Sequence, residues 1–297
     1  MNDSRIVISG ASGLIGGALT RSLRADGTRV VHLVRRPARG ADEVEWLTGS
    51  PLDPDVLAGA AAVVNLNGAS IGRLPWGASY RDTLRRSRLE PTAVLADALL
   101  ALGTAAPALL SASAVGYYGN QPGARLDEAG APGETFLAEI CVEWEREAMR
   151  AADATRVALL RTAPILHPDA VLKPMIALTR VGLGGPLGSG RQVWPWISLE
   201  DEVSAIRHVI DSDLHGPVNL TGPHRATAGG IGRTLASLMH RPYLIPAPAW
   251  ALRLGLGRAA ADSLLLADAD AVPDALTGSG FEFRHPTAPA ALAAVLG

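Results

Sequence analysis

Three glycines near the start of the chain, Gly10, Gly13 and Gly16, have a spacing that can bind phosphate. They follow a short apolar run at residues 6–9 and precede an amphipathic helical pattern at residues 14–23. In a strand–turn–helix unit, glycines let the backbone approach a pyrophosphate, and the helix N-terminus attracts its negative charge. The sequence therefore predicts a dinucleotide site with contacts from Gly10, Ser12, Gly13, Leu14 and Ile15.

The spacing of these glycines is G-x-x-G-x-x-G rather than the G-x-G-x-x-G fingerprint of most dinucleotide sites. A plain turn between a strand and a helix is the alternative. The prediction rests on the order of the elements, because a strand, a turn and a helix follow one another as this kind of site requires.

A second predicted strand, residues 29–34, leads directly into Arg35 and Arg36. At this place an acidic residue hydrogen-bonds the ribose 2′-hydroxyl of NAD, whereas arginine suits the 2′-phosphate of NADP. We therefore expect NADP as the cofactor, with NAD as the less favoured alternative. The competing interpretation is a pair of solvated arginines at a strand end.

The elements that would position these residues alternate along the first 165 residues. Strands are predicted at residues 6–9, 29–34, 44–47, 62–66, 108–111 and 157–160, and helices between them, notably 80–102 and 134–152. Short apolar strands without polar alternation are typical of a parallel sheet covered on both faces. The expected fold is an α/β, doubly wound parallel sheet of the Rossmann type, with residues 1–165 as the NAD(P)-binding domain.

The second half of the chain differs in composition. Residues 182–190 are rich in glycine, and Ser198 has the position of a helix N-cap with Asp201 three residues on. We expect residues 166–297 to form a smaller substrate-binding subdomain that closes over the cofactor domain. The chain is expected to return to the sheet near residues 217–221.

Ligands of doubly wound folds bind beyond the carboxyl ends of the strands. The segments that follow the predicted strands are residues 10–15, 35–36, 67–70, 111–119 and 162–167. We therefore add three residues to the expected cofactor contacts, namely Asn67, Gly68 and Ser111.

Composition excludes several classes of function. The chain has 297 residues, 48% of them hydrophobic, and a formal net charge of −2, which argues against nucleic acid or a membrane surface as the main partner. The single cysteine, Cys141, excludes an intrachain disulfide and favours a reducing cytoplasm, and no signal peptide is expected. The histidines lack metal-ligand spacing, so no metal is expected. The expected partner is a small-molecule substrate; the oligomeric state stays open, with a homodimer as one alternative.

Several motifs resemble one known family. They are residues 10–16, 65–69, Ser87-Arg88, 111–119, 136–138 with Trp144-Glu145, 184–192, 196–201 and the tail from 241 to 281. The chain resembles the extended short-chain dehydrogenases/reductases, and within them the atypical epimerase family proteins (NAD-dependent epimerase/dehydratase-like) that carry a C-terminal module of their own. The resemblance covers essentially the whole chain, and residues 111–119 and 184–190 are specific to the group.

The resemblance implies a tyrosine followed four residues later by a lysine, which lowers the pKa of the tyrosine and holds the cofactor ribose. The chain contains no such pair. Its only lysine is Lys173, and residue 169 is Asp169. The corresponding helix, from Phe136 onward, is apolar where the pair is expected. Two further departures are Asn67, where the group usually has alanine, and Ala163-Pro164, where it usually has glycine and an apolar residue.

The remaining catalytic candidates follow the fifth predicted strand. The resemblance implies a substrate-binding hydroxyl there, which is Ser113 if the motif is aligned on Tyr117 and is absent (Ala114) if it is aligned on Tyr118. A serine that satisfies local backbone is the alternative. Either tyrosine could donate a proton, although an ordinary pKa of about 10 makes a poor base. An aromatic pair that lines a pocket is the competing interpretation.

Other polar and aromatic residues have less specific roles. Arg191 could hold an anionic substrate and Trp196 could stack on a ligand; a solvated loop arginine and core packing are the alternatives. Two sets of charged residues are interpreted as solvated helix faces: Arg85, Arg86 and Arg88, and Glu143, Glu145 and Glu147.

Two functions remain as hypotheses. The first is an NADP-dependent oxidoreductase or epimerase that acts on a small carbonyl, alcohol or sugar-nucleotide-like substrate. The second is a non-catalytic NADP-binding sensor or scaffold, which the missing tyrosine–lysine pair favours.

Overall fold

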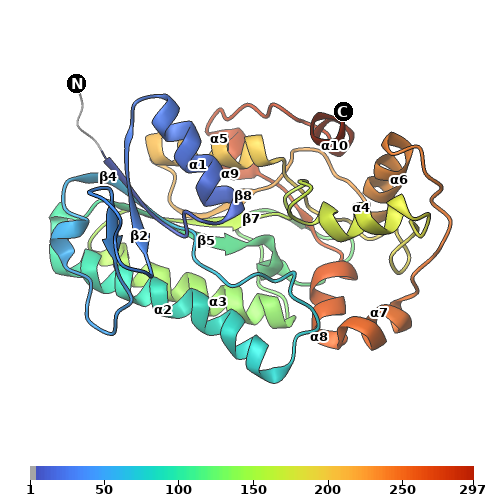
Figure 1. Ribbon diagram of the computed structural model, residues 1–297, viewed down its shortest axis with the longest axis horizontal. Helices are drawn as coiled ribbons and strands as arrows, with labels where there is room; N and C mark the ends of the chain where they lie inside the picture. Colours follow the sequence, from blue (N-terminus) through green and yellow to red (C-terminus); the bar gives the residue numbers. More distant parts are fainter. Residues whose placement is uncertain (1–4) are drawn as a thin grey trace.

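The computed structural model describes residues 5–297 and contains a seven-stranded parallel sheet (Figure 1). The strand order β3-β2-β1-β4-β5-β7-β8 confirms the predicted doubly wound topology. The strands are β1 (Arg5–Ser9), β2 (Arg29–Val34), β3 (Glu43–Glu45), β4 (Ala60–Asn65), β5 (Ala108–Ala114), β7 (Val157–Thr162) and β8 (Gly216–Leu220).

Helices cover both faces of the sheet (Figure 1). On one face lie α1 (Leu14–Ala25) and α5 (Leu199–Asp211), and on the other α2 (Ala78–Leu102) and α3 (Phe136–Met149). The strands supply both cores: in β1, Ile6 and Ile8 face α1 and α5, whereas Val7 faces α2. This burial on both sides explains why the strands show no polar alternation.

Strand β5 is longer than the predicted run at residues 108–111. Its pairing with β7 continues to Ala114, which lies opposite Thr162. Backbone hydrogen bonds to a neighbour hold this extension, although its composition of serine and alanine gives little β signal. The extension carries Ser113 to the carboxyl edge of the sheet.

Residues beyond 165 contribute to the sheet as well as to a helical part. Strand β8 is the seventh strand, beside β7, and α5 packs on α1. The N-cap predicted for α5 is confirmed, since Ser198 Oγ accepts a hydrogen bond from the Asp201 amide at 3.0 Å. The residues after 165 therefore include one strand of the sheet, β8, near the predicted return at 217–221, and a helix, α5, that packs beside α1.

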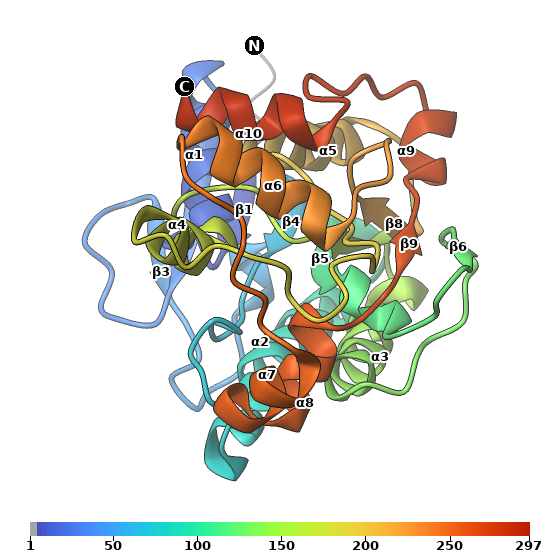
Figure 2. The same ribbon diagram turned by 90° about the vertical axis from the view of Figure 1, so that its right-hand side faces the viewer.

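The remaining C-terminal helices form two groups (Figure 2). Helices α4 (Leu172–Arg180), α6 (Ala228–Leu238) and α10 (Ala288–Leu296) share a core with Trp194 and Trp196. Helices α7 (Ala249–Leu256) and α8 (Arg258–Ala260), with the π-helical turn Ala261–Leu265, pack against the first turns of α2 and α3. These contacts place α7 and α8 on the same side of the sheet as α2 and α3, whereas α10 lies with α4 and α6.

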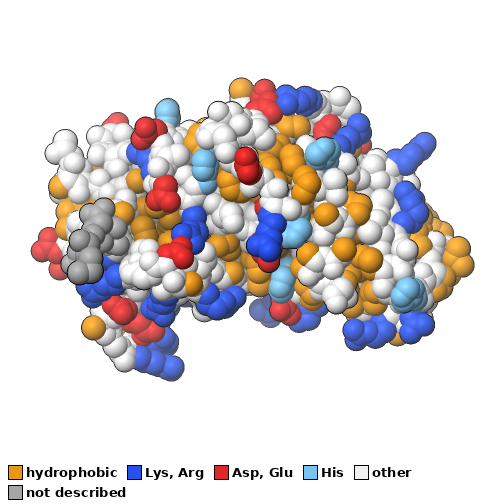
Figure 3. Space-filling model, turned by 90° about the horizontal axis from the view of Figure 1, so that it is seen from above, with side chains coloured by type: hydrophobic (Ala, Val, Ile, Leu, Met, Phe, Trp, Pro, Cys, Tyr) orange, Lys and Arg blue, Asp and Glu red, His pale blue; other side chains and the backbone are white. Residues whose placement is uncertain are grey.

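The other elements are short. They are the strand pair β6 (Arg125–Leu126) and β9 (Asp270–Ala271), α9 (Asp274–Gly278), and 3₁₀ turns at Pro54–Val56, Gly103–Ala105, Val115–Tyr118 and Arg150–Asp153. Across residues 5–297, no helix is both long and apolar enough to cross a membrane. On the face seen in Figure 3, basic and acidic side chains are interspersed, as the small net charge suggests.

Candidate cofactor and substrate site

The glycine turn between β1 and α1 requires glycine at two positions. Gly10 has φ +78°, and a Cβ there would overlap the Leu66 carbonyl oxygen. A Cβ on Gly16 would overlap the Gly10 carbonyl in the same way. The turn is therefore packed directly against the loop that follows β4.

The N-terminus of α1 is available to an anion. Its N-cap is Gly13, which offers no side-chain acceptor to the first amides of Leu14 and Ile15. Ser12 is exposed beside them. The amides and the helix dipole thus fit the pyrophosphate predicted for this turn.

A cavity of about 810 Å³ lies next to the loop that follows β4. Its walls come from the ends of β2 and β4, from residues 47–54 and from one face of α2. Arg35, Asn67 and Gly68 all line it. The volume is in the range of small-molecule sites, and three residues predicted from sequence meet there.

The two arginines after β2 have different surroundings. Arg36 forms a two-pronged ion pair with Glu43, with both N–O distances 2.7 Å. The hydrogen bond from Arg36, with a second from the Arg39 amide, lowers the pKa of Glu43 to about 2. Arg35 is exposed at the cavity and has no carboxylate partner within residues 5–297. Arg35 is thus the arginine that can reach a ligand.

Ser111 belongs to a buried polar network beneath the cavity. Its hydroxyl lies 3.3 Å from Nδ2 of Asn65, which also contacts Thr92 at 2.8 Å. Asn67 donates from Nδ2 to Ser9 Oγ at 2.5 Å and to Asn65 Oδ1 at 2.8 Å. The network joins the carboxyl ends of β1, β4 and β5. The Ser111 side chain is fully buried, so its geometry favours a structural role over the predicted cofactor contact.

Ser113 donates its hydroxyl hydrogen to Glu145 Oε1 at 2.6 Å. Arg161 binds the same carboxylate with Nε and Nη2, at 2.8 and 2.9 Å. Burial opposes the guanidinium charge, but the hydrogen bonds and the charge of Glu145 raise the pKa of Arg161 above its ordinary value. Since its hydrogen points to Glu145, Ser113 presents a lone pair rather than a proton to any ligand.

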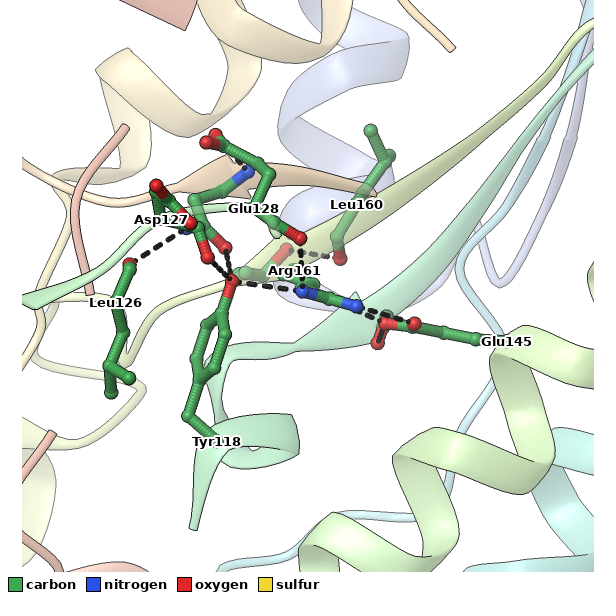
Figure 4. A network of polar contacts seen from close by, with 10 residues as sticks. Tyr118, Leu126, Asp127, Glu128, Glu145, Leu160 and Arg161 are labelled. Atoms are coloured by element: carbon green, nitrogen blue, oxygen red, sulfur yellow. Dashed lines mark hydrogen bonds and ion pairs between the residues drawn. The ribbon is translucent and has the colours of Figure 1, made fainter. Parts of the chain in front are cut away.

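Tyr118 has a buried hydroxyl with three neighbours (Figure 4). It lies 2.8 Å from the Asp127 carbonyl and from Asn219 Oδ1, and accepts from Arg161 Nη1 at 2.9 Å. Burial raises the pKa of Tyr118, and the nearby guanidinium only partly opposes this. This geometry favours a structural role for Tyr118 over proton transfer.

Tyr117 differs from its neighbour. Its ring lies over the guanidinium of Arg161, 3.6 Å from centroid to carbon, and meets the Tyr118 ring edge to face. The residue is partly exposed, and its hydroxyl has no hydrogen-bond partner in the described part of the chain. Of the three predicted catalytic residues, Tyr117 is the one with an O–H still to donate.

The two residues predicted to contact substrate lie apart from the cavity. Trp196 is 1% exposed, donates from Nε1 to the His224 carbonyl at 3.0 Å, and covers Gly222 so closely that a Cβ there would lie 2.6 Å from the ring. This favours core packing over ligand stacking. Arg191 is exposed on the glycine-rich loop, where its amide donates to Ser189 Oγ.

The helix that lacks the tyrosine–lysine pair, α3, buries Leu137, Cys141 and Glu145. Burial raises the pKa of the Cys141 thiol to about 12, so it is neutral and not a nucleophile. The interpretation of Glu145 as part of a solvated face was wrong. Its spacing of four and eight residues from Cys141 and Leu137 places it on their apolar face, and this signal could have been read from the sequence.

Residues 6–221 match the NAD dependent epimerase/dehydratase family, and residues 247–295 match a domain of unknown function, DUF1731. The chain is 42% identical to the epimerase family protein Mb2239 of Mycobacterium bovis, over 97% of this chain and 96% of that protein. It is 30% identical to the human epimerase family protein SDR39U1, over 97% and 98% of the two chains. These matches confirm the resemblance carried by the motifs.

Solved structures share the fold. The crystal structure of human SDR39U1 (isoform 2) with NADPH has a TM-score of 0.89 and 29% identity, with 98% of this chain and 99% of that chain covered. A nucleoside-diphosphate sugar epimerase from Corynebacterium glutamicum has a TM-score of 0.80 and 30% identity, over 99% of this chain and 59% of that chain. MoeE5 in complex with UDP-glucuronic acid and NAD shares the fold at 22% identity and a TM-score of 0.79.

Proposed function

Because the chain belongs to the NAD dependent epimerase/dehydratase family, we propose that it binds NADP and acts as an oxidoreductase or epimerase. The substrate class is a small carbonyl, alcohol or sugar-nucleotide-like compound. The observation that carries the proposal is the position of Arg35, an exposed cation without a carboxylate partner in residues 5–297, at the cavity beside the glycine turn.

The chain's own groups fit each part of this cofactor. Gly10 and Gly16 allow the tight turn between β1 and α1, and the uncapped start of α1 supplies amides to a pyrophosphate. Arg35 suits the 2′-phosphate because a guanidinium binds phosphate oxygens with two donors. The complex of human SDR39U1 with NADPH supports this choice over NAD.

A bound nicotinamide supplies the hydride, and the chain must then supply or take up a proton. Tyr117 is suited to this step, because its hydroxyl is partly exposed and lacks a partner among the described residues. The guanidinium of Arg161 packs against its ring, and Glu145 fixes Arg161 with two hydrogen bonds. Ser113 can orient a substrate hydroxyl by accepting its hydrogen.

A non-catalytic NADP-binding sensor is the second candidate. It is favoured by the missing tyrosine–lysine pair and by the hydrogen of Ser113, which points to Glu145. General acid–base catalysis typically contributes 10²–10⁴-fold in rate, so its loss weakens an enzyme without abolishing hydride transfer.

Titration of the protein with NADPH and with NADH, followed by nicotinamide fluorescence, tests the proposal. Tighter binding of NADPH is the expected result. Equal affinity for the two, or no binding of either, would contradict it. Oxidation of bound NADPH by members of a carbonyl panel separates the enzyme from the sensor, since the sensor leaves NADPH unoxidised with every compound.

A further inference from the structure

Arg88 on α2 is a partly buried cation without a carboxylate partner in residues 5–297. The other arginines of this helix turn have such partners: Arg85 pairs with Glu143, and Arg86 pairs with Glu90. The interpretation of Arg88 as part of a solvated face was therefore wrong. Removing a charge from water without an opposite charge is costly, and burial lowers the pKa of Arg88.

The guanidinium of Arg88 lies under the loop after β4. Nη1 donates to the Leu84 carbonyl at 2.8 Å, and Nη2 donates to the Ala69 carbonyl at 3.2 Å. The ring of Trp144 lies on its other side, with the centroid 5.3 Å from Cζ. These contacts hold the group in one orientation, yet they use only two of the five N–H donors that arginine has.

Gly68 lies against the guanidinium of Arg88 with no side chain between them. A Cβ at this position would lie 3.2 Å from Cζ of Arg88 and 3.5 Å from Nε. Gly68 and Ala69 also line the cavity assigned to the cofactor. Arg88 therefore lies between that cavity and α3, the helix in which the family's tyrosine–lysine pair is missing.

The groups around Arg88 are neutral or already paired. Cys141 is a neutral thiol, and the Tyr80 hydroxyl donates to the Ser70 carbonyl at 2.6 Å. Glu145 is engaged with Arg161. A fixed cation with unused donors and no neighbouring anion in the described chain has the properties of an anion-binding group.

We propose that Arg88 binds an anionic oxygen group of the substrate, a carboxylate or a phosphate. The proposal rests on the proposed function and narrows its substrate class to carbonyl or alcohol compounds that carry such a group. Arg88 acts in binding and orientation, and the proton donor remains Tyr117.

The test uses the full chain saturated with NADPH. Pyruvate and inorganic phosphate are the carboxylate and phosphate probes, methyl pyruvate is the uncharged counterpart, and binding is measured by calorimetry at constant ionic strength. Saturable binding of at least one anion, at least tenfold tighter than that of methyl pyruvate, is expected. Arg88→Met should lose at least tenfold in anion affinity, whereas Arg86→Met on the exposed face should not change it.

The outcomes separate the inference from the proposed function. If the wild type binds NADPH but neither anion saturably, or if Arg88→Met binds the anions as the wild type does, the inference is wrong. If NADPH itself does not bind, the proposed function fails. Should Arg88→Met not fold, Arg88→Lys replaces it: weaker anion binding at a wild-type NADPH affinity is expected, and unchanged anion binding would overturn the inference.

Discussion

The guanidinium of Arg161 lies over the ring of Tyr117, with 3.6 Å between the ring centroid and Cζ. Arg161 is fixed in turn by two hydrogen bonds to Glu145. Tyr117, which follows β5, is thus in contact with Arg161 of β7, and Arg161 is held by Glu145 of α3. The chain lacks the tyrosine–lysine pair of its superfamily. The residues of this arrangement are therefore the ones to substitute in tests of catalysis and stability.

Tyr117→Phe should lower turnover of any substrate that is found by about 10²–10⁴-fold, because it removes the proton donor and leaves the ring on Arg161. The NADPH affinity should stay within twofold of the wild type. Steady-state kinetics and a fluorescence titration measure the two quantities. Turnover equal to that of the wild type would exclude Tyr117 as the donor.

Tyr118→Phe serves as the matched control for Tyr117→Phe. It removes a buried hydroxyl that neighbours Asn219 and Arg161, so it should lower the free energy of unfolding by about 1–3 kcal/mol. Urea unfolding measures this change. A loss of turnover without a loss of stability would transfer the proton-donor role to Tyr118.

Arg35→Asp should move the cofactor preference from NADPH toward NADH. A charge-assisted hydrogen bond contributes about 1.5–3 kcal/mol, so NADPH binding should weaken by about tenfold to a hundredfold. Arg86→Asp, on the exposed face of α2, controls for the change in net charge. An unchanged ratio of the two affinities would show that Arg35 does not meet the 2′-phosphate.

Glu145→Gln should destabilise the protein by about 3–5 kcal/mol, because it leaves the buried guanidinium of Arg161 without its anion. Glu143→Gln on the same helix breaks a partly exposed pair with Arg85 and should cost less than about 1 kcal/mol. Denaturant unfolding compares the two variants. Similar effects in both would mean that the Glu145–Arg161 pair stabilises no more than a surface pair.

Glu202 at the start of α5 should make stability fall as pH rises. Burial raises the pKa of its carboxyl to about 8, although the Thr162 hydroxyl, 2.8 Å from Oε1, opposes this. The folded state keeps the proton above the pH at which the unfolded chain loses it. Stability should therefore decrease between about pH 4.5 and pH 8, by up to about 1.4 kcal/mol per pH unit.

Glu202→Gln removes this titration, so the variant should lack that part of the slope and gain stability over the wild type at pH 8. Urea unfolding at pH 5, 6, 7 and 8 gives both slopes. Glu200→Gln, exposed on the first turn of α5, should leave the wild-type slope intact. Parallel curves for the wild type and Glu202→Gln would show that Glu202 titrates normally.

The sequence was sufficient to predict the sheet because strand burial leaves a local signal. Val7, Val31 and Val63 belong to short apolar runs, and the glycine turn is explained by a close contact that only glycine permits. The N-cap at Ser198 is a local signal as well. Element ends were less predictable where pairing between strands holds them, as at Ala114 in β5.

The candidate site was less predictable because its polar residues are paired by the fold. Nothing in the residue types distinguishes Arg35 from Arg36; the difference is the position of Glu43 in the neighbouring strand β3. Arg88 and Glu145 are of residue types that usually lie at the protein surface. Their burial follows from helix packing between α2 and α3. Sequence periodicity indicates it for both, because Arg88 lies four residues from the buried Leu84 as Glu145 lies four residues from Cys141.

The contact of the C-terminal tail with α2 and α3 has a consequence for synthesis on the ribosome. Trp76, Leu84 and Leu137 are covered by residues near Ala260, which are made long after the helices that they protect. The edge strand β8 also emerges late, at Gly216–Leu220. A nascent chain that has completed its sheet therefore still exposes an apolar surface, and this interval is when the polypeptide is most open to aggregation or to capture by chaperones.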